Sequence, residues 1–77
     1  MSGRKLPRDV TGARFLRAAG RIGFVVERHG KHEVLVRQSD RRRVPVPVHG
    51  SRALGPGLLR KLIGQLGISV EQFLDLL

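Results

Sequence analysis

Residues 24–49 read FVVERHGKHEVLVRQSDRRRVPVPVH, and this run decides the fold. It holds three apolar segments separated by two short polar turns, one at Gly30 and one near Asp40. In the third segment the valines alternate strictly with other residues, which is the period of a strand buried on one face. Its two prolines cannot donate ladder hydrogen bonds, so this strand belongs at a sheet edge. The run predicts an antiparallel three-stranded meander, with strands at about 24–28, 32–38 and 43–49.

Apolar residues at helical spacing predict a helix on either side of this run. The first helix covers about 12–21, with Thr11 as its N-cap and Gly23 just beyond its end. The second begins at Pro56 or Gly57 and ends at Gly67, with an apolar stripe of Leu58, Leu59, Leu62, Ile63 and Leu66. A capping box of Ser69 and Gln72 opens a short third helix that contains Phe73. The order α-β-β-β-α-α predicts an α+β fold, with helices on one face of the sheet and the other face open.

Length and composition exclude several classes of protein. The 77 residues predict one domain over 1–77, in which residues 1–8 form a flexible basic arm. There is no cysteine, which rules out disulfides and thiolate metal sites and fits a reducing cytoplasm. No apolar run approaches the ~20 residues of a membrane span, so we expect no membrane association. A chain this short has no room for a deep cofactor cleft, and we expect no small-molecule cofactor.

The strongest compositional signal is positive charge. Lys and Arg number 15 against six acidic residues, giving a net charge of +9 and a pI near 11.9. Most of the cations are arginine, whose planar guanidinium pairs well with phosphate. A field of this sign attracts polyanions, so nucleic acid is the expected partner. The alternative is a highly charged soluble protein without such a partner.

The segment from Gly23 to His32 resembles the HicA toxins of HicA/HicB toxin–antitoxin systems. That family has a Gly-Phe entry to its first strand, then an Arg, then Gly-Ser-His opening the second strand. The match continues through Val46-Pro47-Val48-His49, through residues 54–63 (LGPGLLRKLI) and through Gly67-Ile68-Ser69. No single piece is specific, but the ordered series covers nearly the whole chain. Lys31 stands where the family usually has Ser, and Leu58 where it often has Thr.

This resemblance implies a fold similar to the double-stranded-RNA-binding domain and an endoribonuclease, or mRNA interferase, that acts on messenger RNA in a bacterial or archaeal cytoplasm. It also implies a HicB-type antitoxin that masks the toxin. The family's catalytic histidine maps onto His32. Because Lys31 replaces the usual Ser, the rate falls if that hydroxyl orients the histidine or the phosphate.

The residues around His32 suit RNA cleavage without a metal. A histidine near its unperturbed pKa of about 6.5 can remove the 2′-OH proton or protonate the leaving 5′-oxygen at neutral pH. Cations at Arg28 and Lys31 would stabilise the developing negative charge. Strand alternation places His32 on the face of Val34 and Val36, which is the open face if Leu35 packs under the helices. Without the family resemblance, a lone histidine at a strand start is more often an ordinary surface residue.

Two other histidines have weaker claims. His49 is a candidate second acid/base partner, with a solvated strand end as the alternative. His29 is interpreted as a turn residue. A metal site on His29 and His32 is not expected, because two ligands are too few and no cysteine or carboxylate cluster completes the set.

The predicted RNA contacts are basic residues beside the turns and the second helix: Arg28, Lys31, Arg41, Arg42, Arg43, Arg60 and Lys61. The run Arg41-Arg42-Arg43 reads equally well as a solvated hairpin. The second helix offers free N–H groups at its first turn, near Arg60 and Lys61. Two other functions remain open: a non-catalytic RNA-binding module of the same fold, and a DNA-binding partner in a repressor complex.

Overall fold

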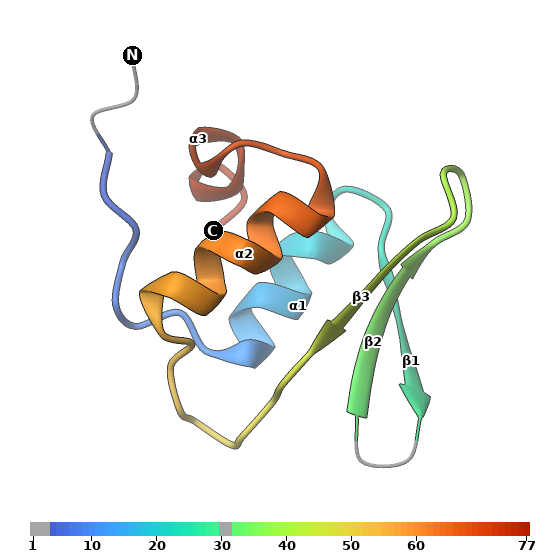
Figure 1. The fold of residues 1–77 in the computed structure, drawn as a ribbon, viewed down its shortest axis with the longest axis horizontal. Helices are drawn as coiled ribbons and strands as arrows, with labels where there is room; N and C mark the ends of the chain where they lie inside the picture. Colours follow the sequence, from blue (N-terminus) through green and yellow to red (C-terminus); the bar gives the residue numbers. More distant parts are fainter. Residues whose placement is uncertain (1–3, 30–31) are drawn as a thin grey trace.

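The computed structural model describes residues 4–29 and 32–77, without the side chains of His29 and His32. Its elements follow the predicted order: α1 (Gly12–Gly20), β1 (Val25–His29), β2 (His32–Arg37), β3 (Arg42–Val46), α2 (Pro56–Leu66) and α3 (Val70–Leu74). The strands form an antiparallel sheet in the order β1-β2-β3. The helices gather on one side and the sheet lies on the other (Figure 1). The predicted α+β architecture is therefore confirmed.

Local sequence signals explain where the helices begin and end. The Thr11 side chain accepts a hydrogen bond from the Arg14 amide at the start of α1. Gly23, at φ 94°, lies in the backbone region that only glycine adopts at little cost, and it turns the chain from α1 into β1. Gly67 ends α2 at φ 82°, and the capping box of Ser69 and Gln72 is formed at α3.

The core lies between the helices and one face of the sheet. From the sheet it takes Leu35, Val44 and Val46, which are at most 2% exposed. The main side chains from the helices are Phe15, Leu59, Leu62, Ile63, Leu66 and Phe73. The rings of Phe15 and Phe73 lie with their centroids 5.4 Å apart, which joins α1 to α3. Burial of these residues fixes which face of the sheet is covered.

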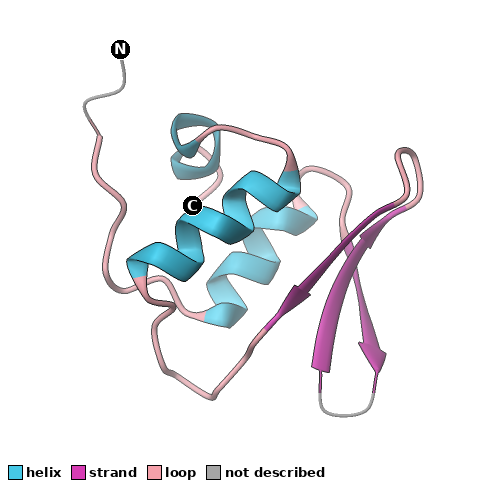
Figure 2. Cartoon of the chain, viewed as in Figure 1, coloured by secondary structure: helices cyan, strands magenta, loops and turns pink. Residues whose placement is uncertain are grey.

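Three details of the sequence prediction are wrong. His29, interpreted as a turn residue, is the last residue of β1, where its backbone pairs with His32. The third strand was expected to reach His49 but ends at Val46, and residues 47–55 form a loop leading to α2 (Figure 2). After Val46 the chain packs against α1: a Cβ at Gly12 would lie 2.9 Å from Val48 Cγ2 and 3.1 Å from the Pro47 carbonyl oxygen. Leu58, expected in the buried stripe of α2, is 38% exposed.

Residues 4–10 run along the helices without regular structure of their own. Leu6 packs against the core and Val10 is fully buried within it. Arg4 pairs with Glu71 at 3.2 Å and with Asp75 at 2.8 Å, so this segment contacts α3 at the other end of the chain. The main chain of Val10 also accepts a hydrogen bond from Leu54. The N-terminal segment therefore contacts α3 through Arg4 and the loop before α2 through Val10.

Candidate nucleic-acid interface

The backbone of His32 begins β2, where it pairs with His29 of β1. Three residues further on, Leu35 is fully buried under the helices. Val34 and Val36 therefore belong to the other face of the sheet, and Val36 is absent from the helix-side core although it is only 9% exposed. Because Leu35 packs under the helices, strand alternation assigns position 32 to the open face, as expected from the sequence. The His32 side chain itself lies outside the described residues, as does Lys31.

His49 lies on the loop after β3 and is exposed. Val46 pairs with Glu33, so the chain leaves the sheet beside the start of β2 and reaches His49 three residues later. There it lines a hollow of about 350 Å³ together with Arg52, Gly55 and Leu58. Because β3 ends at Val46, strand alternation no longer places His49 on either face of the sheet.

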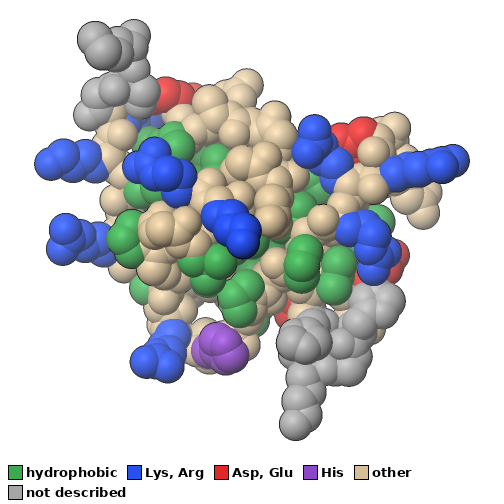
Figure 3. Space-filling view, viewed as in Figure 1, with side chains coloured by type: hydrophobic (Ala, Val, Ile, Leu, Met, Phe, Trp, Pro, Cys, Tyr) green, Lys and Arg blue, Asp and Glu red, His purple; other side chains and the backbone are tan. Residues whose placement is uncertain are grey.

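Ion pairs engage every acidic side chain. Asp9 pairs with Arg14, Glu27 with Arg43, Glu33 with Arg28, Asp40 with Arg37 and Arg42, and both Glu71 and Asp75 with Arg4. Within residues 4–29 and 32–77, the cations with no ion-pair partner are Lys5, Arg8, Arg17, Arg21, Arg41, Arg52, Arg60 and Lys61. Lys and Arg side chains stand apart around one face, with hydrophobic groups between them (Figure 3). The positive charge is therefore distributed, and much of it is available to a polyanion.

The predicted RNA contacts divide into two groups by their surroundings. Arg41, Arg60 and Lys61 are exposed and unpaired in the described part of the chain, and Arg43 has only a 3.7 Å contact with Glu27. Arg42 is instead held within the fold. It donates to Asp40 at 2.8 Å and to the Gln65 carbonyl at the end of α2 at 3.1 Å.

Arg28, another predicted RNA contact, has an ion-pair partner. It pairs with Glu33 at 3.1 Å, and these two residues face each other across β1 and β2. Strand alternation places Arg28 and Glu33 on the same face of the sheet as Leu35, which is the face that the helices cover. Residue 32 belongs to the opposite face. Glu33 is also unusual because its Oε2 is buried with no hydrogen-bond partner among the described residues.

The sequence reasoning did not identify the role of Asp40. Its carboxylate accepts hydrogen bonds from Arg37 and Arg42, and these bonds hold the pKa of the Asp40 carboxyl well below its usual range. Arg37 in turn donates to the Ile22 carbonyl at 2.8 Å and lies over the Phe24 ring at 4.5 Å. The sequence did contain a signal for this role: Asp40 is the one acidic residue in a basic turn, and a carboxylate among arginines normally forms an ion pair with one of them.

Two further observations concern ligands and membranes. Within residues 4–29 and 32–77, no three histidine or carboxylate side chains are grouped so that they could hold a metal ion. None of the helices described has both the length and the apolar character needed to span a bilayer.

Comparison with known proteins gives one family. The model for the HicA toxin of bacterial toxin–antitoxin systems matches residues 12–68, which run from the start of α1 to just past α2. The match includes all three strands and His32. No curated protein matches the chain.

Proposed function

Because the chain belongs to the HicA toxin family of bacterial toxin–antitoxin systems, we propose that it is a metal-independent endoribonuclease that cleaves messenger RNA in the cytoplasm. His32 is the catalytic acid/base. The observation that carries this proposal is the position of residue 32. It opens β2, the strand whose buried Leu35 assigns residues 32, 34 and 36 to the face that the helices leave uncovered.

The proposed reaction is an internal transesterification. A base removes the proton of a ribose 2′-OH, and that oxygen attacks the adjacent phosphorus. The P–O5′ bond breaks, and an acid protonates the departing 5′-oxygen. An imidazole that titrates near neutral pH serves either step. The products are a 2′,3′-cyclic phosphate and a 5′-hydroxyl, and DNA is inert because it lacks the attacking hydroxyl.

His49 is the candidate for the second proton-transfer group. Its loop leaves the sheet beside the start of β2, and the side chain is exposed to solvent next to Arg52. One histidine would then act as the base and the other as the acid. We expect His32 to be indispensable and His49 to contribute less, because only residue 32 coincides with the family's catalytic position.

The described surface supplies suitable charge for an RNA strand. Arg41 and Arg43 lie at the β2–β3 turn, and Arg60 and Lys61 lie on the first half of α2. We assign phosphate contacts to these four residues and to Lys31. Arg28 is a further proposed contact, since its side chain is 77% exposed beside its ion pair with Glu33. Arg42 is given a structural role instead, because it donates to both Asp40 and the Gln65 carbonyl.

The family also implies an antitoxin, and we propose a HicB-type protein that masks the basic surface. A net charge of +9 favours an acidic partner. We do not assign this contact to the acidic C-terminal segment. Phe73 is fully buried, and Glu71 and Asp75 both pair with Arg4.

Analysis of the cleaved ends tests the chemistry. Purified protein is incubated with an RNA oligonucleotide, and with copies carrying a single 2′-deoxy or 2′-O-methyl sugar at the cleaved step. We expect 2′,3′-cyclic phosphate and 5′-hydroxyl ends, and no cut at the substituted step. Cleavage of the substituted RNA, or 5′-phosphate products, would rule out attack by the 2′-oxygen.

The second candidate function is RNA binding without cleavage, and one residue favours it. Lys31 occupies the position where the family usually has Ser. If the protein binds RNA stoichiometrically and does not turn over, Lys31→Ser is the variant to examine. Recovery of cleavage would assign the loss to this substitution.

A further inference from the structure

The open face of the sheet carries a row of three paired residues, one from each strand. Val25 pairs with Val36, and Val36 pairs with Arg43. Val25 is 59% exposed, whereas Val36 between its two neighbours is only 9% exposed. No helix covers this side of the sheet, so the row forms an apolar floor with a guanidinium at one edge.

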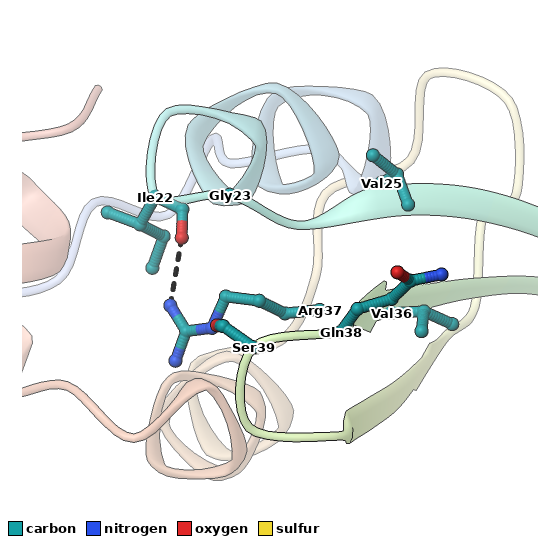
Figure 4. A pocket seen from close by; sticks show the side chains of 7 residues that line it. All are labelled: Ile22, Gly23, Val25, Val36, Arg37, Gln38 and Ser39. Atoms are coloured by element: carbon teal, nitrogen blue, oxygen red, sulfur yellow. Dashed lines mark hydrogen bonds between the residues drawn. The ribbon is translucent and has the colours of Figure 1, made fainter.

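Two hollows meet over this row. One, of about 350 Å³, is lined by Val36, Gln38, Arg41 and Arg43. The other, of about 590 Å³, extends between the start of β1 and the end of β2 and shares Val36 and Gln38 with the first. Figure 4 shows the second hollow, with Val25 on β1, Val36 on β2, Gln38 in the turn that follows β2, and Arg37, also part of the lining, donating to the Ile22 carbonyl. These volumes fall in the range of small-ligand sites.

Asp40 determines which arginines remain available to bind a ligand at these two hollows. It binds Arg37 and Arg42, both of which also donate to backbone carbonyls of the helical layer, Ile22 and Gln65. Arg41 has no ion-pair partner in the described chain, and Arg43 has a single long contact with Glu27. The β2–β3 turn therefore directs two arginines inward and leaves two beside the apolar floor.

We propose that these two adjoining hollows form a subsite for one nucleotide of the RNA strand, on the same open face of the sheet as the cleaved step; this inference rests on the proposed function. Val25 and Val36 contact the face of the base, the Gln38 amide bonds to its polar edge, and Arg41 and Arg43 hold the flanking phosphate. The chain has no Trp or Tyr, so apolar side chains and guanidinium planes must replace aromatic stacking. Val36 lies four residues from His32 along β2, roughly 13 Å at ~3.3 Å per residue.

The occupant is a nucleotide because the hollow combines three kinds of group. A phosphate alone, or a carboxylate from an acidic peptide, would need only the two arginines. The apolar floor, of which Val25 is the exposed part, and the amide are useful to a ligand that has a flat apolar face and a hydrogen-bonding edge beside its negative charge. Amide side chains both donate and accept, so Gln38 is suited to select among bases.

Binding is tested first without turnover, on the full-length His32→Ala protein. The four nucleoside 3′-monophosphates are titrated by NMR, with inorganic phosphate as the control. We expect the Val25 and Val36 methyls and the Gln38 side-chain amide to shift, and one nucleotide to bind about tenfold tighter than phosphate, as expected for one base contact. Equal affinity for phosphate, or shifts confined to other surfaces, would overturn the subsite.

Cleavage by the otherwise unchanged protein separates this inference from the proposed function. Gln38→Ala should change the nucleotide preferred near the cut in a randomised RNA pool. Arg41→Asn should weaken RNA binding more than the charge-matched control Arg17→Gln on α1. Asn tolerates the positive φ of 58° at Arg41, so the turn is retained.

Each remaining outcome has a definite meaning. If the parent cleaves RNA and Gln38→Ala keeps its rate and sequence preference, the subsite is wrong and the proposed function stands. If Arg41→Asn weakens only antitoxin binding, the hollow is a protein contact and the subsite is again wrong. If the parent neither binds nor cleaves RNA, both proposals fail together.

Discussion

The guanidinium of Arg37 donates two hydrogen bonds to the carboxylate of Asp40, from Nε at 3.1 Å and from Nη2 at 2.8 Å. The same guanidinium reaches the Ile22 carbonyl, while Arg42 joins Asp40 to the end of α2. Asp40 and these two arginines therefore connect the β2–β3 turn to the turn after α1 and to the end of α2. Asp40 also decides which arginines of the turn remain free for a ligand.

Asp40→Asn should lower the stability of the protein at neutral pH. The bonds from Arg37 and Arg42 depress the pKa of the folded Asp40 carboxyl, so its stabilisation is complete above the unfolded pKa of about 4 and is lost as the pH falls toward the folded value. Thermal unfolding at several pH values measures this. We expect the melting temperatures of parent and variant to differ most near pH 7 and to converge in acid. A constant difference across the range would contradict the role of the carboxylate charge.

Gly12→Ala should destabilise the protein, whereas Gly64→Ala should not. A Cβ at Gly12 would lie 2.9 Å from Val48 Cγ2, where α1 meets the loop after β3. At Gly64, inside α2, nothing lies within 4 Å of a new Cβ, and replacing a helical glycine gains about 0.5–1 kcal/mol. Urea unfolding of both variants checks the contrast. A stable Gly12→Ala variant would show that the loop is not fixed against α1.

Phe73→Ala should cost about 3–5 kcal/mol, the usual range for deleting a buried phenylalanine. Phe73 is fully buried and stacks on Phe15 across the core. Leu77→Ala, four residues later and 39% exposed, is the matched control and should have little effect. Denaturant unfolding gives both values, and equal losses would mean that the C-terminal segment is not anchored through Phe73.

The salt dependence of RNA binding should separate two neighbouring arginines. Arg43→Ala should reduce the slope of log affinity against log salt by up to about one, because the residue is available to a phosphate. Arg42→Ala should leave the slope unchanged and instead lower stability, because it loses bonds to Asp40 and Gln65. Fluorescence anisotropy with a fixed RNA at several salt concentrations distinguishes these outcomes. Equal slopes for the two variants would show that the ion pairs do not determine which cations reach RNA.

Much of the fold was predictable because its signals are local. Thr11, Gly23, Gly67 and the box of Ser69 with Gln72 each fix a helix end, either by a side-chain cap or by a positive φ, within a few residues of that end. The edge position of the third strand followed from its prolines, which tolerate only an unpaired side of the ladder. All of these depend on residues close together in sequence.

The errors arise where a distant contact decides the outcome. The valine alternation continues through Val48, which does pack against the core, but the strand ends at Val46 because the residues after it pack against Gly12 of α1. In the sequence Arg42 cannot be distinguished from Arg41 and Arg43. What distinguishes it is a hydrogen bond to the carbonyl of Gln65, more than twenty residues away. The hollow over Val25 and Val36 depends on strand register, which a single strand pattern does not show.

Catalysis at His32 is tested by cleavage of a long single-stranded RNA in excess EDTA, by the parent protein beside His32→Ala and His49→Ala. We expect the parent to cleave, His49→Ala to cleave more slowly, and His32→Ala to bind RNA without cleaving it. Equal cleavage by the parent and His32→Ala, or a parent that needs a divalent cation, would contradict metal-independent catalysis at His32.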